Sequence, residues 1–300
     1  MKAWLNGEIV PWDRITVPLL SHSFSRGSAI FEVVDVVSTV RGPALFGLAE
    51  HIERFFNSAT LTFMELPLTR RELIDAVIST ARENGITNGI AKFFAFYPLV
   101  EPTVIPTDPR VDVAIFCMDY DFFGLKPEER SKPARVGISS FRKIHGGTVP
   151  VHAKVVGNYV NAFLAKMEVK KKGYDDVIML DTAGFVAEGA TSNVFFVSDN
   201  KVKTPTLTSA LPGITRHALI ELIRDMGYVM SETDIRPEQL HDFDEGFYSG
   251  STVKVQPIVS IDGTDLKKPC PGPVTCAVKE RMNQTVRGEI EQYIKWLTMI

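Results

Sequence analysis

The chain has 300 residues, of which 45% are hydrophobic, and its 33 basic and 36 acidic residues give a formal net charge of -3. A chain of this length can bury a large core and predicts about two domains. The near balance of charge creates no long-range field that would attract nucleic acid or an anionic membrane, so small molecules or proteins are the expected partners.

The sequence predicts a cytoplasmic protein without a membrane segment. Its N-terminus reaches the turn signal Asn6-Gly7 before any apolar run long enough for a signal peptide. The longest apolar stretch, Ile90 to Val100, contains Lys92 and is much shorter than the roughly 20 residues that span a bilayer.

The cysteines and histidines predict neither disulfides nor a metal site. The three cysteines are an odd number without C-x-x-C spacing, and the six histidines form no familiar pair of metal ligands. Metal is therefore not expected.

The first 120 residues predict alternating strands and helices. Asn6-Gly7 favours a hairpin, and the β-branched run 29–39 favours a strand that places Phe31, Val33 and Asp35 on one face. Helices are predicted over 48–64, from the spacing of its apolar residues, and from Thr69 to Asn84-Gly85, where Glu72 completes a capping box. Two further strands are predicted over 89–98 and 111–120.

The polar, proline-containing stretch 121–133 predicts a linker between domains 1–120 and 134–300. The second domain is expected to begin with a strand to Phe141 and a glycine-rich turn at 145–147. A helix over about 159–172 follows, ending in basic residues before Gly173.

Lys154 stands alone in the apolar and small-residue stretch 149–162, with no carboxylate within eight positions on either side. An ammonium in apolar surroundings loses hydration, which favours the neutral, nucleophilic amine of an imine-forming lysine. The alternative is that Lys154 extends to water from the end of a strand, as most lysines do, and this stretch alone favours that alternative.

Two later stretches change that balance. Glu188 precedes small polar residues and an apolar strand, and a buried carboxylate needs a partner such as a protonated ring nitrogen. The run A-L-P-G-I-T-R at 210–216 leads into an amphipathic helix, so Gly213, Ile214 and Thr215 would present backbone N–H groups that attract phosphate.

The motifs K-x-x-G-N-Y, E-G-x-x-S-N and L-P-G-I-T-R occur in that order, and their combination resembles the class IV (fold type IV) pyridoxal-phosphate enzymes. This family includes branched-chain and D-amino-acid aminotransferases and aminodeoxychorismate lyase. The resemblance extends from W-L-N-G-E near the start to G-P-V-T at 272–275. It implies an α/β (α+β) fold of two α/β domains with the cofactor in the interdomain cleft, and a homodimer or higher homo-oligomer whose partner completes the pocket.

The resemblance also implies roles for individual residues. Lys154 would form the aldimine with pyridoxal 5'-phosphate and carry the proton between substrate and cofactor. Glu188 would keep the pyridine nitrogen protonated, and Tyr159 would contact the phenolic oxygen. The other residues expected to bind the cofactor, mainly through its phosphate and the adjoining loop, are Arg54, Ser192, Asn193, Ile214, Thr215 and Ser251.

The presumed substrate residues are mixed in type. L-P-G-I-T-R, Phe31-Glu32 and the T-V-P before the lysine look most like branched-chain aminotransferases, whereas Val33 is more like the D-amino-acid enzymes. Asp35 stands where the family commonly has a basic residue, and Lys92 also lies in a run that departs from the family pattern. The expected substrate contacts are Phe31, Val33, Asp35, Lys92, Gly250 and Thr252.

We therefore expect a ping-pong aminotransferase that moves an amino group from an amino acid, with a branched-chain donor favoured, to a 2-oxo acid. The alternatives are a D-amino-acid or (R)-amine transaminase, a lyase on the same cofactor, and a catalytically silent binding protein. One hypothesis pairs Asp35 with Lys92 at the pocket rim, or has one of them contact a charged substrate group. His152 would share a strand face with Lys154 and could tune it, although an ordinary packed histidine is the simpler account.

Overall fold

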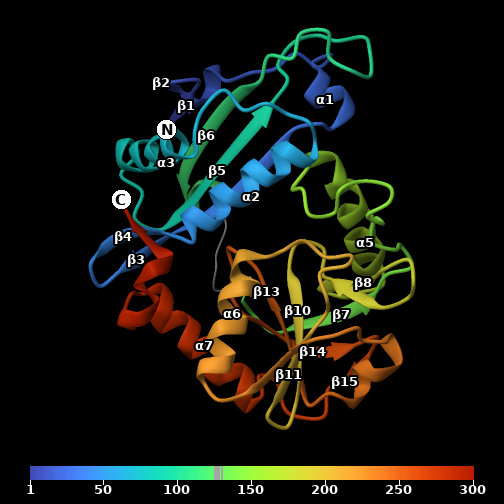
Figure 1. Ribbon diagram of the computed structural model, residues 1–300. Coiled ribbons are helices and arrows are strands. Elements are labelled where there is room, and N and C mark those ends of the chain that lie inside the picture. Colours follow the sequence, from blue (N-terminus) through green and yellow to red (C-terminus); the bar gives the residue numbers. More distant parts are fainter. Residues whose placement is uncertain (125–128, 130) are drawn as a thin grey trace. The chain divides into compact units, whose positions relative to one another are not determined.

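The computed structural model describes residues 1–124, 129 and 131–300 and shows a mixed α/β chain (Figure 1). Contacts group the chain into two compact units. Unit 1 contains Met1–Leu125, Ala153–Tyr159 and Thr285–Ile300, and unit 2 contains Lys126–His152 and Val160–Gln284. The predicted domain boundaries and linker stay predictions, and residues 125–128 and 130 of that linker lie outside the described residues.

Unit 1 is built on a seven-stranded antiparallel sheet in the order β16-β4-β3-β5-β6-β1-β2. The hairpin predicted at Asn6-Gly7 joins its first two strands, and both turn residues have positive φ, 47° and 104°. The strands are β1 (Lys2–Leu5), β2 (Glu8–Pro11), β3 (Ile30–Thr39), β4 (Gly42–Phe46), β5 (Gly89–Phe96), β6 (Asp112–Asp119) and β16 (Leu297–Met299).

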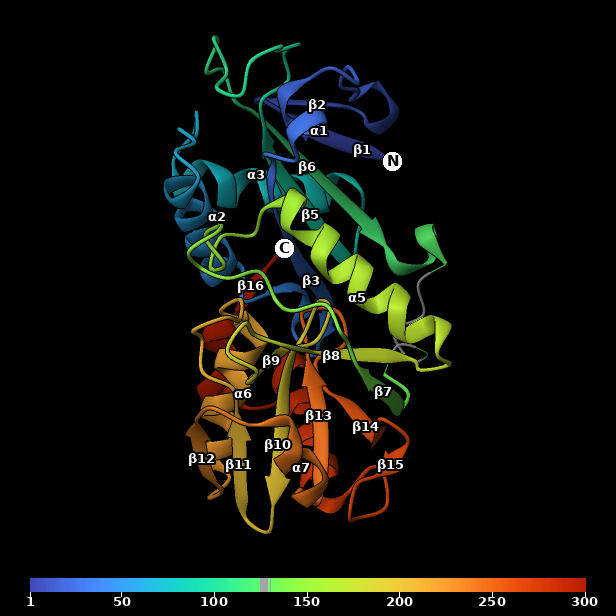
Figure 2. The same cartoon turned by 90° about the vertical axis from the view of Figure 1, so that its right-hand side faces the viewer.

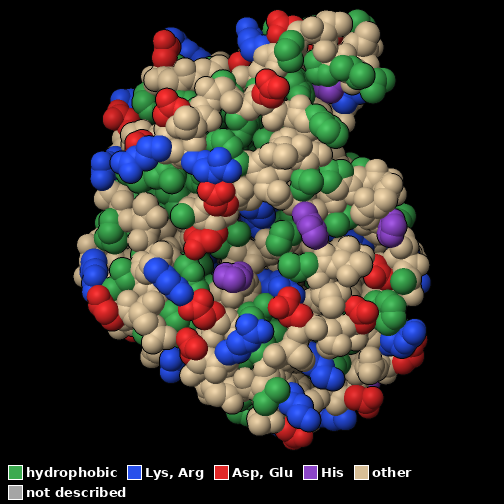
Figure 3. Space-filling view, in the orientation of Figure 1, with side chains coloured by type: hydrophobic (Ala, Val, Ile, Leu, Met, Phe, Trp, Pro, Cys, Tyr) green, Lys and Arg blue, Asp and Glu red, His purple; other side chains and the backbone are tan. Residues whose placement is uncertain are grey.

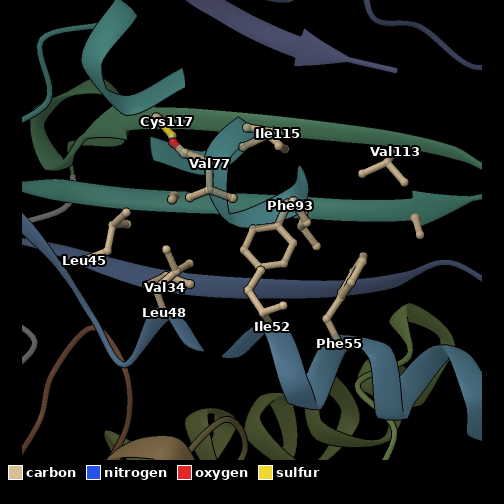
Figure 4. Close-up of a cluster of buried hydrophobic side chains, with 14 of the residues drawn as sticks. Val34, Leu45, Leu48, Ile52, Phe55, Val77, Phe93, Val113, Ile115 and Cys117 are labelled. Atoms are coloured by element: carbon tan, nitrogen blue, oxygen red, sulfur yellow. Dashed lines mark hydrogen bonds between the residues drawn. The ribbon is translucent and has the colours of Figure 1, made fainter. Parts of the chain in front are cut away.

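Helices α2 (Leu48–Leu61) and α3 (Arg70–Glu83) pack on one face of this sheet. Figure 4 shows Ile52 and Phe55 of α2 directed toward Phe93 on β5, and the rings of Phe55 and Phe93 meet edge to face at 5.1 Å. Burial of each such side chain contributes about 1.5–3 kcal/mol. The predicted capping box is present, since Thr69 and Glu72 exchange side-chain and backbone hydrogen bonds. The short helix α1 (His22–Arg26) also belongs to unit 1.

The opposite face of the sheet carries the side chains that the alternation of β3 predicted. Val33 lies opposite Lys92 and Phe31 opposite Phe94 in the antiparallel pairing of β3 with β5. Because side chains alternate along a strand, Phe31, Val33, Asp35 and Lys92 share this face, whereas Val34 points toward α2. The prediction that Phe31, Val33 and Asp35 share one face is confirmed.

Unit 2 contains a nine-stranded mixed sheet in the order β12-β11-β10-β13-β14-β7-β8-β9, with β15 added beside β14. Figure 2 shows β10, β13 and β14 across the middle of this sheet. The strands are β7 (Ala134–Ile138), β8 (Asp176–Leu180), β9 (Val186–Glu188), β10 (Asn193–Ser198), β11 (Lys201–Thr204), β12 (Val229–Glu232), β13 (Glu245–Ser249), β14 (Gln256–Ile261) and β15 (Thr264–Asp265).

Apolar layers cover both faces of β10, which explains its continuous hydrophobic sequence. Phe195 stacks on Phe247 and its neighbour Phe196 stacks on Phe243, each pair with ring centroids 5.0 Å apart. Consecutive residues of a strand point to opposite faces, so both faces are buried. The helices of this part of the chain are α5 (Tyr159–Lys171), α6 (Ile214–Asp225) and α7 (Pro273–Val286).

Short 3-10 helices complete the described elements, at Trp12–Arg14, Tyr120–Phe123, Val156–Asn158, Pro237–Asp242 and Glu291–Trp296. None of the helices in the described part of the chain has the length and apolar character needed to cross a bilayer. Basic and acidic side chains are interspersed on the face shown in Figure 3. Several form exposed ion pairs, such as Arg71 with Asp75, which contribute little to stability.

Candidate active site

Lys154 lies in unit 1, although most of the chain around it in sequence belongs to unit 2. Its segment runs beside the start of β3, where Ile30 and Val155 form an isolated antiparallel bridge. The backbone N–H of Phe31 donates a hydrogen bond of 3.1 Å to the carbonyl of Lys154. The lysine is therefore attached to the strand that carries three of the predicted substrate residues, Phe31, Val33 and Asp35.

The side chain of Lys154 is surrounded by aromatic groups. Its Nζ donates a hydrogen bond of 2.8 Å to the hydroxyl of Tyr159 and lies 5.0 Å from the ring centre of Phe31. The rings of Phe31 and Tyr159 meet at 4.9 Å, and Lys92 Nζ lies 5.4 Å from Phe31 and 5.0 Å from Phe94. We call Phe31, Lys92, Phe94, Lys154 and Tyr159 the lysine cluster.

Lys92 is the second amine of the lysine cluster. Burial lowers its pKa, and the positive charge of Lys154 lowers it further. Asp35 accepts a hydrogen bond from the hydroxyl of Tyr120. The hypothesis of an Asp35–Lys92 ion pair is wrong for this structure, because Lys92 is directed over aromatic rings. The other half of that hypothesis, recognition of a charged substrate group, remains a prediction.

A buried ion-pair network lies on the other face of β3. Glu32 is fully buried and accepts hydrogen bonds from Arg54 Nε at 2.7 Å, Arg54 Nη2 at 2.8 Å and His51 Nδ1 at 2.7 Å. We call Glu32, His51 and Arg54 the Glu32 network. An ionised carboxylate only accepts hydrogen bonds, so His51 carries a proton on Nδ1.

The electrostatics of the Glu32 network favour a charged glutamate and a neutral histidine. Burial alone would raise the pKa of Glu32, but Arg54 and His51 outweigh it and hold that pKa well below its usual value. Burial lowers the pKa of His51 to about 4 from the ordinary 6.5, although Glu32 opposes this shift.

The sequence motifs predicted Arg54 as a phosphate ligand but did not predict its carboxylate partner, Glu32. The available signal was the alternation of β3, which places Glu32 on the same face as Val34 and Val36. A carboxylate at such a buried position requires a cation. His51 and Arg54 supply donors from one side of α2.

In unit 2, Glu188 stands at the end of β9 and is 5% exposed. It accepts hydrogen bonds from Asn193 Nδ2 at 3.1 Å and from the backbone N–H of Leu211 at 3.2 Å, and it pairs with Lys143 at 2.5 Å. We call Lys143, Glu188, Asn193 and Leu211 the Glu188 network. The sequence did not predict Lys143, because nothing in its local pattern distinguishes it from a solvated lysine.

The Glu188 network joins two of the three sequence motifs. Asn193, the last residue of E-G-x-x-S-N, also donates from Nδ2 to the carbonyl of Leu211 in L-P-G-I-T-R, at 3.0 Å. A Cβ atom on Gly213 would lie 2.0 Å from Asn193 Oδ1, and one on Gly189 would lie 2.6 Å from Ser192 Oγ. Gly213 is therefore required by the close approach of the two motif loops, and Gly189 by the tight turn within E-G-x-x-S-N.

The start of α6 offers backbone donors without a side-chain cap. Gly213 is its N-cap residue, and Ile214 and Thr215 form its first turn. Unpaired N–H groups at a helix start attract anions. Arg216 of the same motif is directed elsewhere, because its Nη2 donates to the carbonyl of Pro205 and to Glu232.

The loop after β13 contains Gly250, Ser251 and Thr252. The backbone N–H of Lys254 donates to the carbonyl of Gly250, and its Nζ donates to the carbonyl of Ser251. Just before this loop, the buried hydroxyl of Ser249 has no hydrogen-bond partner among the described residues. Ser249 lies opposite Asn193 in the β10–β13 pairing, so this unsatisfied hydroxyl is close to the Glu188 network.

His152 is held by the backbone, since its Nε2 donates to the carbonyl of Leu207 at 2.7 Å. The described residues contain no group of three or more His, Cys, Asp or Glu side chains that could hold a metal ion. The chemistry available in these networks is therefore that of an amine, a phenol, a buried carboxylate and an uncapped helix start.

Residues 29–261 match the family model described as amino-transferase class IV. The chain is 31% identical over 297 residues to the branched-chain-amino-acid aminotransferase of Pseudomonas aeruginosa, covering 99% of this chain and 96% of the relative. It is 32% identical over 300 residues to the enzyme of the same name from Escherichia coli K12, with the same coverage.

Solved structures of branched-chain aminotransferases have the same fold. The enzyme of Thermoproteus uzoniensis with norvaline superposes with a TM-score of 0.93 at 32% identity, covering 99% of this chain and 98% of that one. The enzyme of Thermobaculum terrenum in its PLP-form (holo-form) gives a TM-score of 0.91 at 28% identity, covering 99% of this chain and 97% of that one.

Proposed function

The chain belongs to the class IV aminotransferases, and from that premise we propose that Lys154 is the residue through which it works. The chain is a pyridoxal-phosphate-dependent aminotransferase. The single observation that supports this role of Lys154 is the position of its amine, which donates a hydrogen bond of 2.8 Å to the Tyr159 hydroxyl and lies beside the ring of Phe31.

The residues of the chain fit the chemistry of pyridoxal 5'-phosphate. When bound, this cofactor supplies an electron-withdrawing ring that stabilises negative charge on the carbon bearing the amino group. An anionic phosphate suits an uncapped helix start, a protonated ring nitrogen suits a buried carboxylate, and a carbonyl carbon suits an amine nucleophile. Near the Glu188 network, the buried hydroxyl of Ser249 also lacks a hydrogen-bond partner among the described residues.

We assign to Lys154 two tasks, covalent attachment of the cofactor and transfer of a proton at Nζ to and from the substrate's α carbon. Tyr159 orients this amine and places a hydroxyl near the cofactor's phenolic oxygen. The rings of Phe31 and Tyr159 lie beside Nζ, with their centres 5.0 and 5.5 Å away.

Glu188 accepts the hydrogen bond of the protonated ring nitrogen in this proposal. Lys143 and Asn193 orient its carboxylate. Ser192 holds the loop between Glu188 and Asn193, because its carbonyl accepts a hydrogen bond of 2.7 Å from the N–H of Gly189. Charge-assisted hydrogen bonds of this kind are stronger than neutral ones. The phosphate is assigned to Arg54, Ile214, Thr215 and Ser251.

We propose that the donor is an aliphatic, branched-chain-like amino acid and the acceptor a 2-oxo acid. The relatives of the chain carry the name branched-chain-amino-acid aminotransferase. The face of β3 and β5 with Phe31, Val33 and Phe94 supplies apolar contacts for such a side chain. Asp35, Lys92, Gly250 and Thr252 are the further substrate contacts in this assignment.

Rapid mixing of the holoenzyme with single amino donors tests the function. L-leucine, L-isoleucine and L-valine are expected to convert the absorbance of the aldehyde form of the cofactor to that of the amine form. D-amino acids and (R)-amines are expected to react much more slowly. Faster conversion by a D-amino acid or an amine would contradict the donor assignment, and product release without any oxo acid would indicate a lyase.

We also propose a cytoplasmic homodimer. The outward side of α5 is apolar, because Val160 and Phe163 are about 60% exposed and Leu164 and Met167 are 40% exposed. In unit 1, Val104 and Ile105 are nearly 80% exposed, and Figure 3 shows apolar side chains around the loop that joins β5 to β6. Patches of this kind mark protein interfaces.

Sedimentation equilibrium tests the dimer. The expected mass is twice the chain mass of 33.4 kDa. Phe163→Asp should shift the protein to monomer, whereas Lys171→Asp, at the polar end of the same helix, should not. A monomeric wild-type protein would contradict the proposal.

A further inference from the structure

The backbone of Lys154 is held by hydrogen bonds on both sides. The N–H of Val155 donates to the carbonyl of Ala153 at 3.1 Å, so Lys154 is the central residue of a three-residue γ-turn. Its carbonyl accepts from Phe31, and its own N–H donates to Ser58 Oγ at 3.0 Å. These three contacts fix the direction in which the Cα–Cβ bond of Lys154 leaves the chain.

Ser58 lies on α2 and is fully buried. Its hydroxyl proton is used within the helix, since Oγ donates to the carbonyl of Arg54 at 2.9 Å. The oxygen is therefore oriented as an acceptor, and it accepts a hydrogen bond from the N–H of Lys154.

These contacts close a ring. Arg54 and His51 attach α2 to Glu32 on β3, and Ser58, one turn further along α2, attaches the helix to Lys154. The carbonyl of Lys154 in turn accepts a hydrogen bond from the N–H of Phe31 on β3, the residue before Glu32. The lysine is thus fixed to the strand and to the helix, while the helix is fixed to the strand by the Glu32 network.

We propose that Ser58 is a positioning residue for Lys154, an inference that rests on the proposed function of that lysine. Its hydroxyl sets the orientation of the γ-turn and, through it, the position of Nζ against Tyr159. A misplacement of about 1 Å at a reacting group can lower a rate by about 100-fold. Ser58 itself takes no part in the bond changes.

Ser58→Ala tests the proposal, with Thr80→Val as the matched control. Thr80 is also a fully buried helix hydroxyl that donates four residues back, to Ala76 at 2.7 Å, but its oxygen accepts no hydrogen bond from an N–H group of the described residues. In Ser58→Ala we expect kcat to fall on the order of tenfold or more with KM little changed. Hydrogen exchange of the Lys154 amide in the full-length protein should accelerate on the order of tenfold, since its acceptor is lost. Thr80→Val should change neither.

Wild-type kcat and unchanged exchange at Lys154 in Ser58→Ala would overturn the proposal, as would equal losses of kcat in Ser58→Ala and Thr80→Val. If Ser58→Ala does not fold, Ser58→Cys provides a weaker acceptor of similar size and should give an intermediate exchange rate; a wild-type rate would overturn the proposal. Mapping of the cofactor to another residue would instead contradict the proposed function, while the exchange data would still report on the Ser58–Lys154 hydrogen bond.

Discussion

Two of the buried glutamates, Glu32 and Glu188, each receive donors from three groups but have different surroundings. Glu32 receives its donors from Arg54 and His51 on one helix, in the buried layer between α2 and β3. Glu188 receives its donors from Lys143, Asn193 and the Leu211 backbone, at a meeting point of motif loops. From this difference we propose that Glu32 stabilises the fold and orients α2, whereas Glu188 serves the cofactor.

Glu188→Gln should separate the two roles most strongly. An amide cannot hold a ring nitrogen protonated as a carboxylate does, so we expect kcat to fall by about 100- to 1000-fold. The melting temperature should fall less than in Glu32→Gln, because glutamine still accepts from Asn193 and Leu211 and because Lys143, whose side chain is 16% exposed, is less buried than Arg54. Steady-state kinetics and thermal unfolding of the holoenzyme measure both effects, and a large loss of stability with normal kcat would reverse the assignment.

Glu32→Gln should mainly destabilise the fold. It removes the negative charge opposite Arg54 and leaves a buried guanidinium uncompensated, which costs about 3–5 kcal/mol. Urea unfolding of the variant measures this loss of free energy. Stability equal to that of the wild type would show that the Glu32 network does not anchor α2.

The same network predicts acid sensitivity. The pKa of His51 is about 4 in the folded chain and 6.5 as the ordinary value, so the unfolded chain binds the proton first as pH falls. The contribution of neutral His51 to the unfolding free energy is therefore complete above about pH 6.5 and is lost as pH falls toward 4. At 1.36 kcal/mol per pKa unit, this loss amounts to about 3 kcal/mol. His51→Asn should flatten the dependence of the unfolding free energy on pH in this window. An unchanged slope would contradict the assignment.

An exposed ion pair gives the smallest expected effect. Arg71 and Asp75 lie 2.9 Å apart on α3, with side chains 83% and 55% exposed. Arg71→Ala should change the unfolding free energy by less than about 0.5 kcal/mol, because solvent screens the pair. A loss as large as that of Glu32→Gln would show that burial does not explain the difference.

Local patterns predicted most of the elements. The alternation of β3, the apolar spacing of α2 and the capping box at Thr69 each record packing within a few residues, and the structure confirms all three. The predicted helix at 48–64 ends at Leu61, three residues earlier, a normal uncertainty for helix ends.

Pairings over long sequence distances were not visible in the local pattern. The contact of Glu32 with Arg54 spans 22 residues, and that of Lys154 with Ser58 spans 96. The proposed Asp35–Lys92 ion pair was wrong because strand register placed Lys92 opposite Val33, beside aromatic rings, while Tyr120 reached Asp35. The cofactor assignments came from the motif resemblance, and the individual roles stay predictions.

Borohydride reduction of the holoenzyme followed by peptide mapping tests the central assignment most directly. The account predicts a phosphopyridoxyl group on the peptide that contains Lys154, and none on the peptide that contains Lys92, the other amine of the lysine cluster. A label on Lys92 or on any other residue, or no label at all, would contradict it.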